Sequence, residues 1–228
     1  MFSYRDHREG DVRVDVAFTD STIDLQGLRP GFETELPRLE KACGVRLARV
    51  NQVHGDGVRV VHQPGPPPME DVPTADALVT TTPGLGLMVR IADCVPVLLA
   101  DPGRGVVGAV HAGRAGVLLG VVGRAVERMR AEGAEGLVAW VGPHVCGECY
   151  EVPEQMRAEV AARVPQTYAV TRWGTPSLDL GAGVRAQLDE LGVGVTEVGR
   201  CTLEDPRLHS HRRDGADAGR MAGLVWMS

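Results

Sequence analysis

Short apolar runs recur along the whole chain, and most of them are bounded by Gly, Pro or Asp. Runs of roughly 4–8 apolar and β-branched residues between such breaks are typical of buried β-strands. The chain carries them at residues 12–18, 46–50, 57–62, 76–81, 86–92, 95–100, 105–110, 137–141 and 223–227. We therefore expect β-sheets to dominate the fold.

Helical periodicity is limited to residues 33–44, 116–134, 153–164 and 183–193. Predicted strands outnumber these helices and do not alternate with them regularly. This pattern favours an α+β fold over a doubly wound parallel sheet. The segment "HQPGPPPMED" can continue neither a strand nor a helix, so it is expected to be an exposed loop that interrupts the domain without dividing it.

The length of 228 residues is sufficient for one core, and we expect a single domain over residues 1–228. The net charge of −6 gives no basic footprint for nucleic acid or an anionic membrane, so a small-molecule partner is favoured and no protein partner is indicated. The N-terminus lacks the apolar core of a signal peptide, and no apolar run reaches the ~18 residues of a membrane span. A cytoplasmic location is expected.

Two histidines and a cysteine occur where chemistry would need them, beside glycines or at the ends of apolar runs. His54 lies in "NQVHGDGV", Cys94 follows the run 86–92, and His111 follows the run 105–110. A thiolate and two imidazoles suit zinc, and three protein ligands leave a fourth position open. Their spacing is far wider than that of zinc-finger ligands. The residues alone therefore leave three interpretations open: core residues, a Cys94 nucleophile with His111 as its base, or ligands of one metal.

The "CGEC" segment from Cys146 to Cys149 could form half of a structural zinc site or a redox pair. No second C-x-x-C or H-x-x-x-H motif completes it. The odd number of cysteines, five, favours free thiols or a metal site over a disulfide framework. Phosphate-binding loops, Rossmann glycines and a serine-hydrolase elbow do not occur in the sequence.

Basic residues gather near the C-terminus. They are His209, His211, Arg212, Arg213 and Arg220. Because arginine presents a planar fork of donors to phosphate or carboxylate, this cluster could seat an anion.

Several of these segments follow one another in a family-specific order. The matching pieces are "NQVHGDGV", "TADALVTTTPGLGLMVRIADCVPVLLADP", "GVVGAVHAGRAG", "VGPHVCGECYEV" and "CTLEDPRLHSHRRDGADAGRMAGLVWM". Through them the chain resembles the YfiH-type family, which is variously called the laccase-domain, polyphenol oxidase, purine nucleoside phosphorylase or peptidoglycan editing factor family. The resemblance covers the chain from Asn51 to the C-terminus.

The resemblance implies a layered α/β sandwich of mixed sheets with flanking helices. It implies a zinc site, with copper as the alternative ion, formed by His54, Cys94 and His111. It also implies phosphorolysis of adenosine, inosine or guanosine and deamination of adenosine, whereas older descriptions of the family name copper-dependent phenol oxidation. Purine nucleosides and phosphate are the expected small-molecule partners.

In this interpretation Cys94 and Asp93 serve catalysis, Asp93 by orienting the ligands or by proton transfer. Arg212 and Arg213 are the candidates for the phosphate contact, and Gln52 is a further candidate for substrate binding. The family usually has "HAGWRG" where this chain has "HAGRAG", so that Arg114 replaces the tryptophan and Ala115 the arginine. Arg114 is therefore expected to contact the substrate or phosphate from a neighbouring position.

Two alternatives from other classes remain beside the nucleoside enzyme. A metal-free cysteine hydrolase would use Cys94 and His111 and has no evident need of His54. A metal- or nucleoside-binding protein without activity would be consistent with the changed residues 114 and 115. Copper-linked phenol oxidation ranks below these, because one site of two histidines and a cysteine lacks the several copper centres that oxygen reduction needs.

Overall fold

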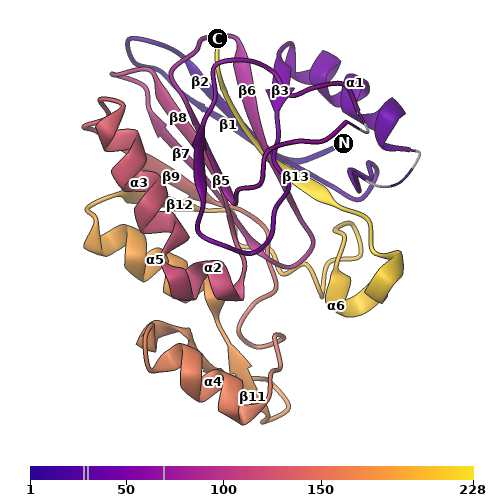
Figure 1. Ribbon diagram of the computed structural model, residues 1–228. Coiled ribbons are helices and arrows are strands. Elements are labelled where there is room, and N and C mark those ends of the chain that lie inside the picture. Colours follow the sequence, from indigo (N-terminus) through magenta and orange to yellow (C-terminus); the bar gives the residue numbers. More distant parts are fainter. Residues whose placement is uncertain (28, 30, 69) are drawn as a thin grey trace.

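Two mixed β-sheets packed face to face form the centre of the molecule (Figure 1). The computed structural model describes residues 1–27, 29, 31–68 and 70–228. The five-stranded sheet has the order β1 (Phe2–Arg8), β2 (Val14–Thr19), β13 (Met221–Met227), β6 (Leu85–Ile91) and β3 (Arg46–Ala48). The six-stranded sheet has the order β12 (Gly194–Glu197), β9 (Val138–Val141), β7 (Val95–Asp101), β8 (Val106–Ala112), β5 (Ala77–Thr80) and β4 (Val58–Val60).

Helices cover the outer faces of both sheets. On the five-stranded sheet lies α1 (Phe32–Cys43), and on the six-stranded sheet lie α2 (Arg114–Leu119), α3 (Val121–Ala131) and α5 (Leu180–Glu190). A smaller lobe holds α4 (Glu154–Ala161), η1 (Pro165–Thr167) and the hairpin of β10 (Tyr168–Val170) and β11 (Pro176–Leu178), while α6 (His211–Asp214) and η2 (Gly215–Asp217) precede β13 (Figure 1). This arrangement confirms the predicted layered α/β sandwich of mixed sheets.

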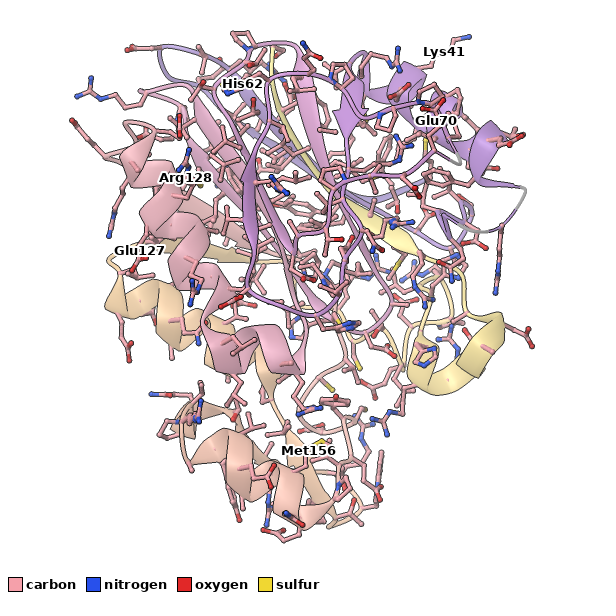
Figure 2. The ribbon with its side chains drawn as sticks, viewed as in Figure 1. Lys41, His62, Glu70, Glu127, Arg128 and Met156 are labelled. Atoms are coloured by element: carbon pink, nitrogen blue, oxygen red, sulfur yellow. The ribbon has the colours of Figure 1, made fainter. Side chains whose placement is uncertain are left out.

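The four layers explain why the apolar runs are continuous rather than alternating. In β7, Leu98 and Ala100 face the other sheet, whereas Val97 and Leu99 pack under α3 and α5. Both faces of each central strand are covered, so every position along it favours an apolar side chain. The exposed side chains of Glu127 and Arg128 on α3 extend away from these layers (Figure 2).

All the predicted apolar runs form strands, and each predicted helical segment contains a helix. The segment 116–134 is two helices, because Gly120 adopts a left-handed backbone with φ 78° that ends α2 and starts α3. Strand β1 escaped prediction since its sequence "FSYRDHR" is polar and it forms the sheet edge. In the proline-rich segment, the described residues 62–68 and 70–71 form neither helix nor strand, and Met69 lies outside the described residues. None of the helices described here is long and apolar enough to cross a membrane.

The contact between the two sheets requires a glycine after β9. A Cβ atom on Gly142 would lie 2.3–2.6 Å from three ring carbons of Phe18 in β2, a side chain that is only 1% exposed and has no room to move.

We expect Gly142→Ala to lower the free energy of unfolding by about 1–3 kcal/mol in urea denaturation, because the sheets must separate. Gly123→Ala in α3 is the matched control. Its Cβ meets nothing within 4 Å, and it should raise stability by about 0.5–1 kcal/mol. Equal stability of Gly142→Ala and the wild type would contradict this packing.

Candidate metal centre

The six-stranded sheet gathers the predicted site residues at one end. In the β7–β8 hairpin, Val95 pairs with Ala112 and Pro96 with His111. Because the hairpin folds back on itself, Cys94, just before β7, becomes the neighbour of His111 at the end of β8. Strand β5 pairs with the other side of β8 and carries parallel β4 beside it, so the residues that precede β5 and β4 reach the same end. Those residues include Asp76 and His54.

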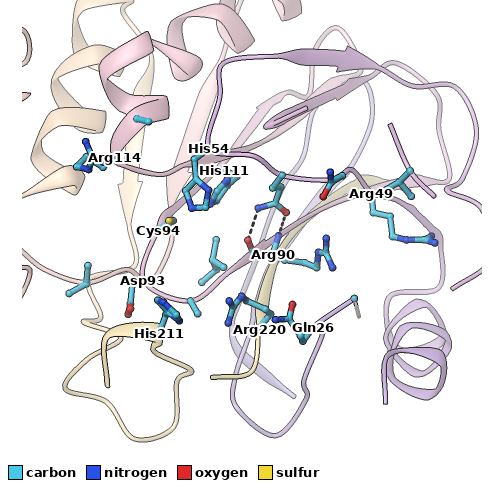
Figure 3. A pocket seen from close by; sticks show the side chains of 18 of the residues that line it. Gln26, Arg49, His54, Arg90, Asp93, Cys94, His111, Arg114, His211 and Arg220 are labelled. Carbon is cyan, nitrogen blue, oxygen red and sulfur yellow. Dashed lines mark hydrogen bonds between the residues drawn. The ribbon is translucent and has the colours of Figure 1, made fainter. Parts of the chain in front are cut away.

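His54, Cys94 and His111 converge closely (Figure 3). Their potential ligand atoms all lie within 4.8 Å of one another, and the two imidazole rings meet edge to face with centroids 4.8 Å apart. His111 is buried, Cys94 is partly buried and His54 is exposed. The three side chains therefore form the wall of a cavity rather than part of the apolar core.

Asp76 organises both histidines. Its buried carboxylate accepts a hydrogen bond from His111 Nδ1 at 2.8 Å, which leaves His111 Nε2 as the nitrogen available to a metal. The same carboxylate accepts the backbone N–H groups of Val53, His54 and Gly55 at 3.3, 2.9 and 2.7 Å. These bonds hold His54 in a left-handed conformation with φ 60°, which side-chain-bearing residues rarely adopt. Asp76 is not among the residues predicted from the sequence, although an acidic residue at the head of an apolar run was a usable signal.

The glycine of "HAG" is required by the close approach of the other ligands. A Cβ atom on Gly113 would lie 2.5 Å from Cδ2 of His54 and 3.2 Å from Sγ of Cys94. Any larger residue at this position would push the imidazole of His54 away from the other two groups.

The electrostatics of the centre favour a thiolate. Burial acts to raise the pKa of Cys94, but hydrogen bonds and charge from His111 and His54 outweigh it and lower that pKa to about 6. Burial acts to lower the pKa of His111, but Asp76 and Cys94 raise it to about 9. Burial also opposes ionisation of Asp76, yet His111 and the backbone donors hold its pKa below the usual value. At neutral pH the metal-free pair is a thiolate beside an imidazolium, and a metal ion would displace the imidazolium proton.

This donor set fits a zinc or copper ion. One soft sulfur and two imidazole nitrogens converge, one imidazole is oriented by a buried carboxylate, and the remaining side faces the cavity. Structural zinc sites usually have four protein ligands, whereas three ligands and an open side are typical of catalytic ones.

The cavity has a volume of about 730 Å³, within the range of ~300–1,000 Å³ typical of small-molecule sites. Its wall is rich in basic groups. The arginines that line it are Arg49, Arg90, Arg114, Arg212 and Arg220. The acidic residues are Glu70, Asp71 and Asp93, and the aromatic ones are Phe32 and Tyr150.

Asp93 lies beside Cys94 but turns toward the C-terminal segment. Its carboxylate accepts the hydroxyl of Thr202 at 2.6 Å and the backbone N–H of Arg212 at 2.6 Å. Its backbone is left-handed, with φ 92°. In this structure Asp93 joins the Cys94 turn to the start of α6, and its role in catalysis stays a prediction.

Gln52 and Arg114 both line the cavity. The amide of Gln52 pairs with the backbone of Arg90, donating to its carbonyl at 2.7 Å and accepting its N–H at 2.8 Å. Arg114 enters from the first turn of α2 with Ala115 beside it. In Figure 3, Arg114 lies on one side of the three metal-ligand candidates, and Arg90 and Arg220 lie on the other. Contact of Gln52 or Arg114 with substrate stays a prediction.

The two arginines proposed for phosphate are separated by the fold. The guanidinium of Arg212 lies 5.0 Å from the ring centre of Tyr150, at the cavity wall. Arg213 instead donates to the carbonyls of Thr202 and Leu208 at 3.0 and 2.7 Å and to Asp214, and it is not among the described residues that line the cavity. Arg213 therefore braces the loop before α6.

Arg90 was missed because it lies inside an apolar run, where a lone charge was the only signal. Burial lowers the pKa of Arg90, and the positive charges of Arg49 and Arg220 lower it further. The guanidinium groups of Arg90 and Arg220 donate to backbone carbonyls at 2.9–3.4 Å, whereas the backbone N–H of Arg220 donates to the carboxylate of Asp24 at 2.9 Å. Positive charge therefore gathers on this side of the cavity, although Glu70 and Asp71 also line the cavity.

Comparison with known proteins agrees with the fold and the motifs. The profile of the family described as multi-copper polyphenol oxidoreductase laccase matches residues 33–228. A Streptomyces coelicolor protein named purine nucleoside phosphorylase is 55% identical over 194 residues, which are 82% of this chain and 78% of that protein. The crystal structure of a Neisseria meningitidis protein has a TM-score of 0.82 at 26% identity and covers 98% of this chain and 99% of its own. That of Bacillus licheniformis YfiH has a TM-score of 0.84 at 23% identity, over 94% and 93% of the two chains. The resemblance that the motifs indicated is confirmed.

Replacing Asp76 tests its control of the centre. Asp76→Asn keeps the shape of the side chain but turns an amide N–H₂ group toward backbone N–H donors. Because these buried donors lose their acceptor, the free energy of unfolding should fall by about 1–3 kcal/mol. Zinc affinity, measured by competition with a chromophoric chelator, should fall about 10–100-fold. Asp56→Asn, in the same loop but paired with Arg124 at the surface, should leave both quantities unchanged. Unaltered zinc affinity in Asp76→Asn would show that Asp76 does not orient the ligands.

The lowered pKa of Cys94 predicts a distinct pH profile for the metal-free protein. Because its thiolate form increases as pH rises through about 6, alkylation of Cys94 by iodoacetamide should rise from pH 5 to 7 and then level off. Cys43, whose pKa burial raises to about 11, should react slowly over that range. Peptide mass spectrometry measures both rates. A midpoint for Cys94 near the ordinary thiol value of 9.0 would contradict the pairing with His111 and His54.

Proposed function

This chain belongs to the multi-copper polyphenol oxidoreductase laccase family, and we propose that it is a zinc-dependent purine nucleoside phosphorylase. Its substrates would be adenosine, inosine or guanosine together with phosphate, and adenosine deamination would be a second activity of the same site. One observation carries the proposal: a candidate metal site and five arginines line the same cavity. The name of the Streptomyces coelicolor relative supports the same reaction.

His54, Cys94 and His111 would hold the zinc ion, which supplies Lewis acidity toward a substrate oxygen or a water molecule. Asp76 fixes the imidazole of His111 and the backbone of residues 53–55, so the ligand set is arranged before any ligand binds. This preorganisation avoids an entropic cost at the moment of binding.

Phosphate would bind on the side of Arg90 and Arg220. Burial lowers the pKa of Arg90, and repulsion from the positive charges of Arg49 and Arg220 lowers it further. A phosphate dianion relieves that repulsion and accepts the planar forks of arginine donors. The side-chain amide of Gln52 makes two hydrogen bonds to the backbone of Arg90. Because Gln52 is only two residues before His54, these bonds fix the position of Arg90 relative to His54.

The purine would lie toward Tyr150 and Arg212. Tyr150 offers an aromatic face, and Arg212 lies 5.0 Å from its centre. In phosphorolysis a phosphate oxygen forms a bond to C1′ of the ribose while the bond from C1′ to the purine nitrogen breaks. The purine leaves with the electron pair of that bond and takes a proton from water, and the positive charge of Arg212 would stabilise it as it leaves.

The metal-free cysteine hydrolase also has a supporting observation. The Cys94 thiolate beside a protonated His111 is the ion pair that such enzymes use, with a pKa of about 6 for Cys94. However, His54 is a third converging donor, and Asp76 holds it in place at the cost of a left-handed backbone. A metal site accounts for that arrangement and a dyad does not.

Phosphate dependence provides the test. The purified protein should release purine base and ribose 1-phosphate from inosine or adenosine only when phosphate is present, and Cys94→Ala should lose the activity. Arg90→Ala and Arg220→Ala should each raise the KM for phosphate about tenfold or more, since each loses a hydrogen bond to a charged group. Arg38→Ala on the outer surface of α1 is the matched control and should behave as wild type.

Three results would contradict the proposal. Release of free ribose without phosphate would indicate a nucleoside hydrolase. A metal-free protein with Cys94-dependent esterase activity would support the cysteine hydrolase. A phosphate KM unchanged in Arg90→Ala and Arg220→Ala would move the anion site elsewhere in the cavity.

A further inference from the structure

A second cluster of metal-ligand side chains lies outside the cavity. The sulfur atoms of Cys146, Cys149 and Cys201 and a carboxylate oxygen of Glu204 all lie within 4.8 Å of one another. Cys149 is buried, Cys146 and Cys201 are partly buried, and Glu204 is exposed. From the sequence, the C-x-x-C pair lacked the further ligands that a metal site needs. The fold supplies them from a distant segment.

Backbone pairing brings the two segments together. His144 and Cys201 form a parallel β-bridge. The N–H of His144 donates to the carbonyl of Arg200 at 3.2 Å, and the N–H of Thr202 donates to the carbonyl of His144 at 3.0 Å. The residues from Cys146 to Cys149 then turn tightly, with the N–H of Cys149 donating to the carbonyl of Cys146 at 3.0 Å. The convergence of the sulfurs is thus fixed by the main chain.

Two of the sulfur atoms accept hydrogen bonds from N–H donors. The backbone N–H of Cys146 donates to Sγ of Cys201 at 3.4 Å, and the guanidinium of Arg172 donates to Sγ of Cys149 at 3.5 Å. Arg172 also pairs with the carboxylate of Glu204 at 2.6 Å. Donors of this kind stabilise thiolates and orient ligands around metal ions.

We propose that Cys146, Cys149 and Cys201 bind a zinc ion, with Glu204 as its fourth ligand. Two cysteines separated by two residues have the spacing of structural zinc sites, and three thiolates select a soft ion. In a tetrahedral site with Zn–S bonds of ~2.3 Å, sulfurs lie about 3.8 Å apart, a distance the cluster allows. Four protein ligands close the site, so its role is structural.

The three thiols would bind a divalent ion as thiolates. Each coordinating thiol would release its proton to water as the ion binds, and the charge of the ion would offset the repulsion between the adjacent sulfurs.

The second site would stabilise one wall of the cavity. Val145, next to Cys146, donates its N–H to the carbonyl of Asp93 at 3.0 Å, and Thr202, next to Cys201, donates its hydroxyl to the carboxylate of Asp93. Tyr150, next to Cys149, lines the cavity itself. An ion that joins these two segments therefore holds the turn at Cys94 from behind.

Elemental analysis of the protein, purified under reducing conditions with zinc present, tests this site. We expect two zinc ions per chain in the wild type and one in Cys146→Ser, in Cys201→Ser and in Cys94→Ala. Cys43→Ser, a cysteine of α1 outside both clusters, is the matched control and should keep two. If the cavity site holds no zinc, the wild type and Cys94→Ala should both contain one ion and Cys201→Ser none, so the two proposals can fail separately.

Cobalt substitution gives a second readout, which begins with the wild-type protein. In the wild type, Co²⁺ at three thiolates should give strong sulfur-to-metal absorption in the near ultraviolet, well above that of a site with a single thiolate, and the band should persist in Cys94→Ala. Removal of the ion with a chelator should lower the melting temperature. The proposal is overturned if the zinc content of folded Cys146→Ser and Cys201→Ser equals that of the wild type. A disulfide among these three cysteines in the freshly purified protein would also overturn it.

Discussion

The buried carboxylate of Asp76 is the interaction on which the rest of the cavity depends. It is fully buried at the head of β5, yet all of its bonds go to the two histidines and their loop: Nδ1 of His111 and the backbone N–H groups of residues 53–55. A buried charge is costly unless it is fully hydrogen-bonded, and these donors remove the cost. In return, one residue fixes the orientation of one ligand and the strained backbone of another. The centre is therefore built as a unit with the sheet.

The sheet determines which residues meet, and this explains what the sequence could reveal. The apolar runs were recognisable because the central strands are covered on both faces, which leaves no polar alternation along them. The edge strand β1 carries no such signal because its sequence is polar, and strands β10 to β12 carry none because each has only three or four residues. The break between α2 and α3 depends on the left-handed backbone of Gly120, a choice that helical periodicity does not record.

The metal-ligand candidates were found by residue type, but their convergence was not predictable from spacing. Cys94 and His111 meet because β7 and β8 form a hairpin in one particular register, and His54 joins them through β4 and β5. Family motifs supplied the trio without that geometry. For the basic residues, proximity in sequence was misleading. Arg212 and Arg213 are neighbours in sequence, yet Arg212 lies at the cavity wall and Arg213 braces a loop. Arg90, inside an apolar run, lies in the cavity because it is the residue of β6 that Gln52 clamps.

The two clusters of metal-ligand residues differ in how open they are to the cavity. Around the cavity, two imidazoles and one thiolate converge and one side stays open to the arginines, so a bound ion keeps a position for substrate. Behind it, three thiols and a carboxylate converge with donors of their own, and a bound ion would be enclosed. Asp93 lies between them: its backbone precedes Cys94, and its carboxylate and carbonyl bind the neighbours of Cys201 and Cys146. Loss of the enclosed ion would therefore loosen the turn that carries Cys94, whereas loss of the cavity ion would leave the segments around Cys146 and Cys201 in place.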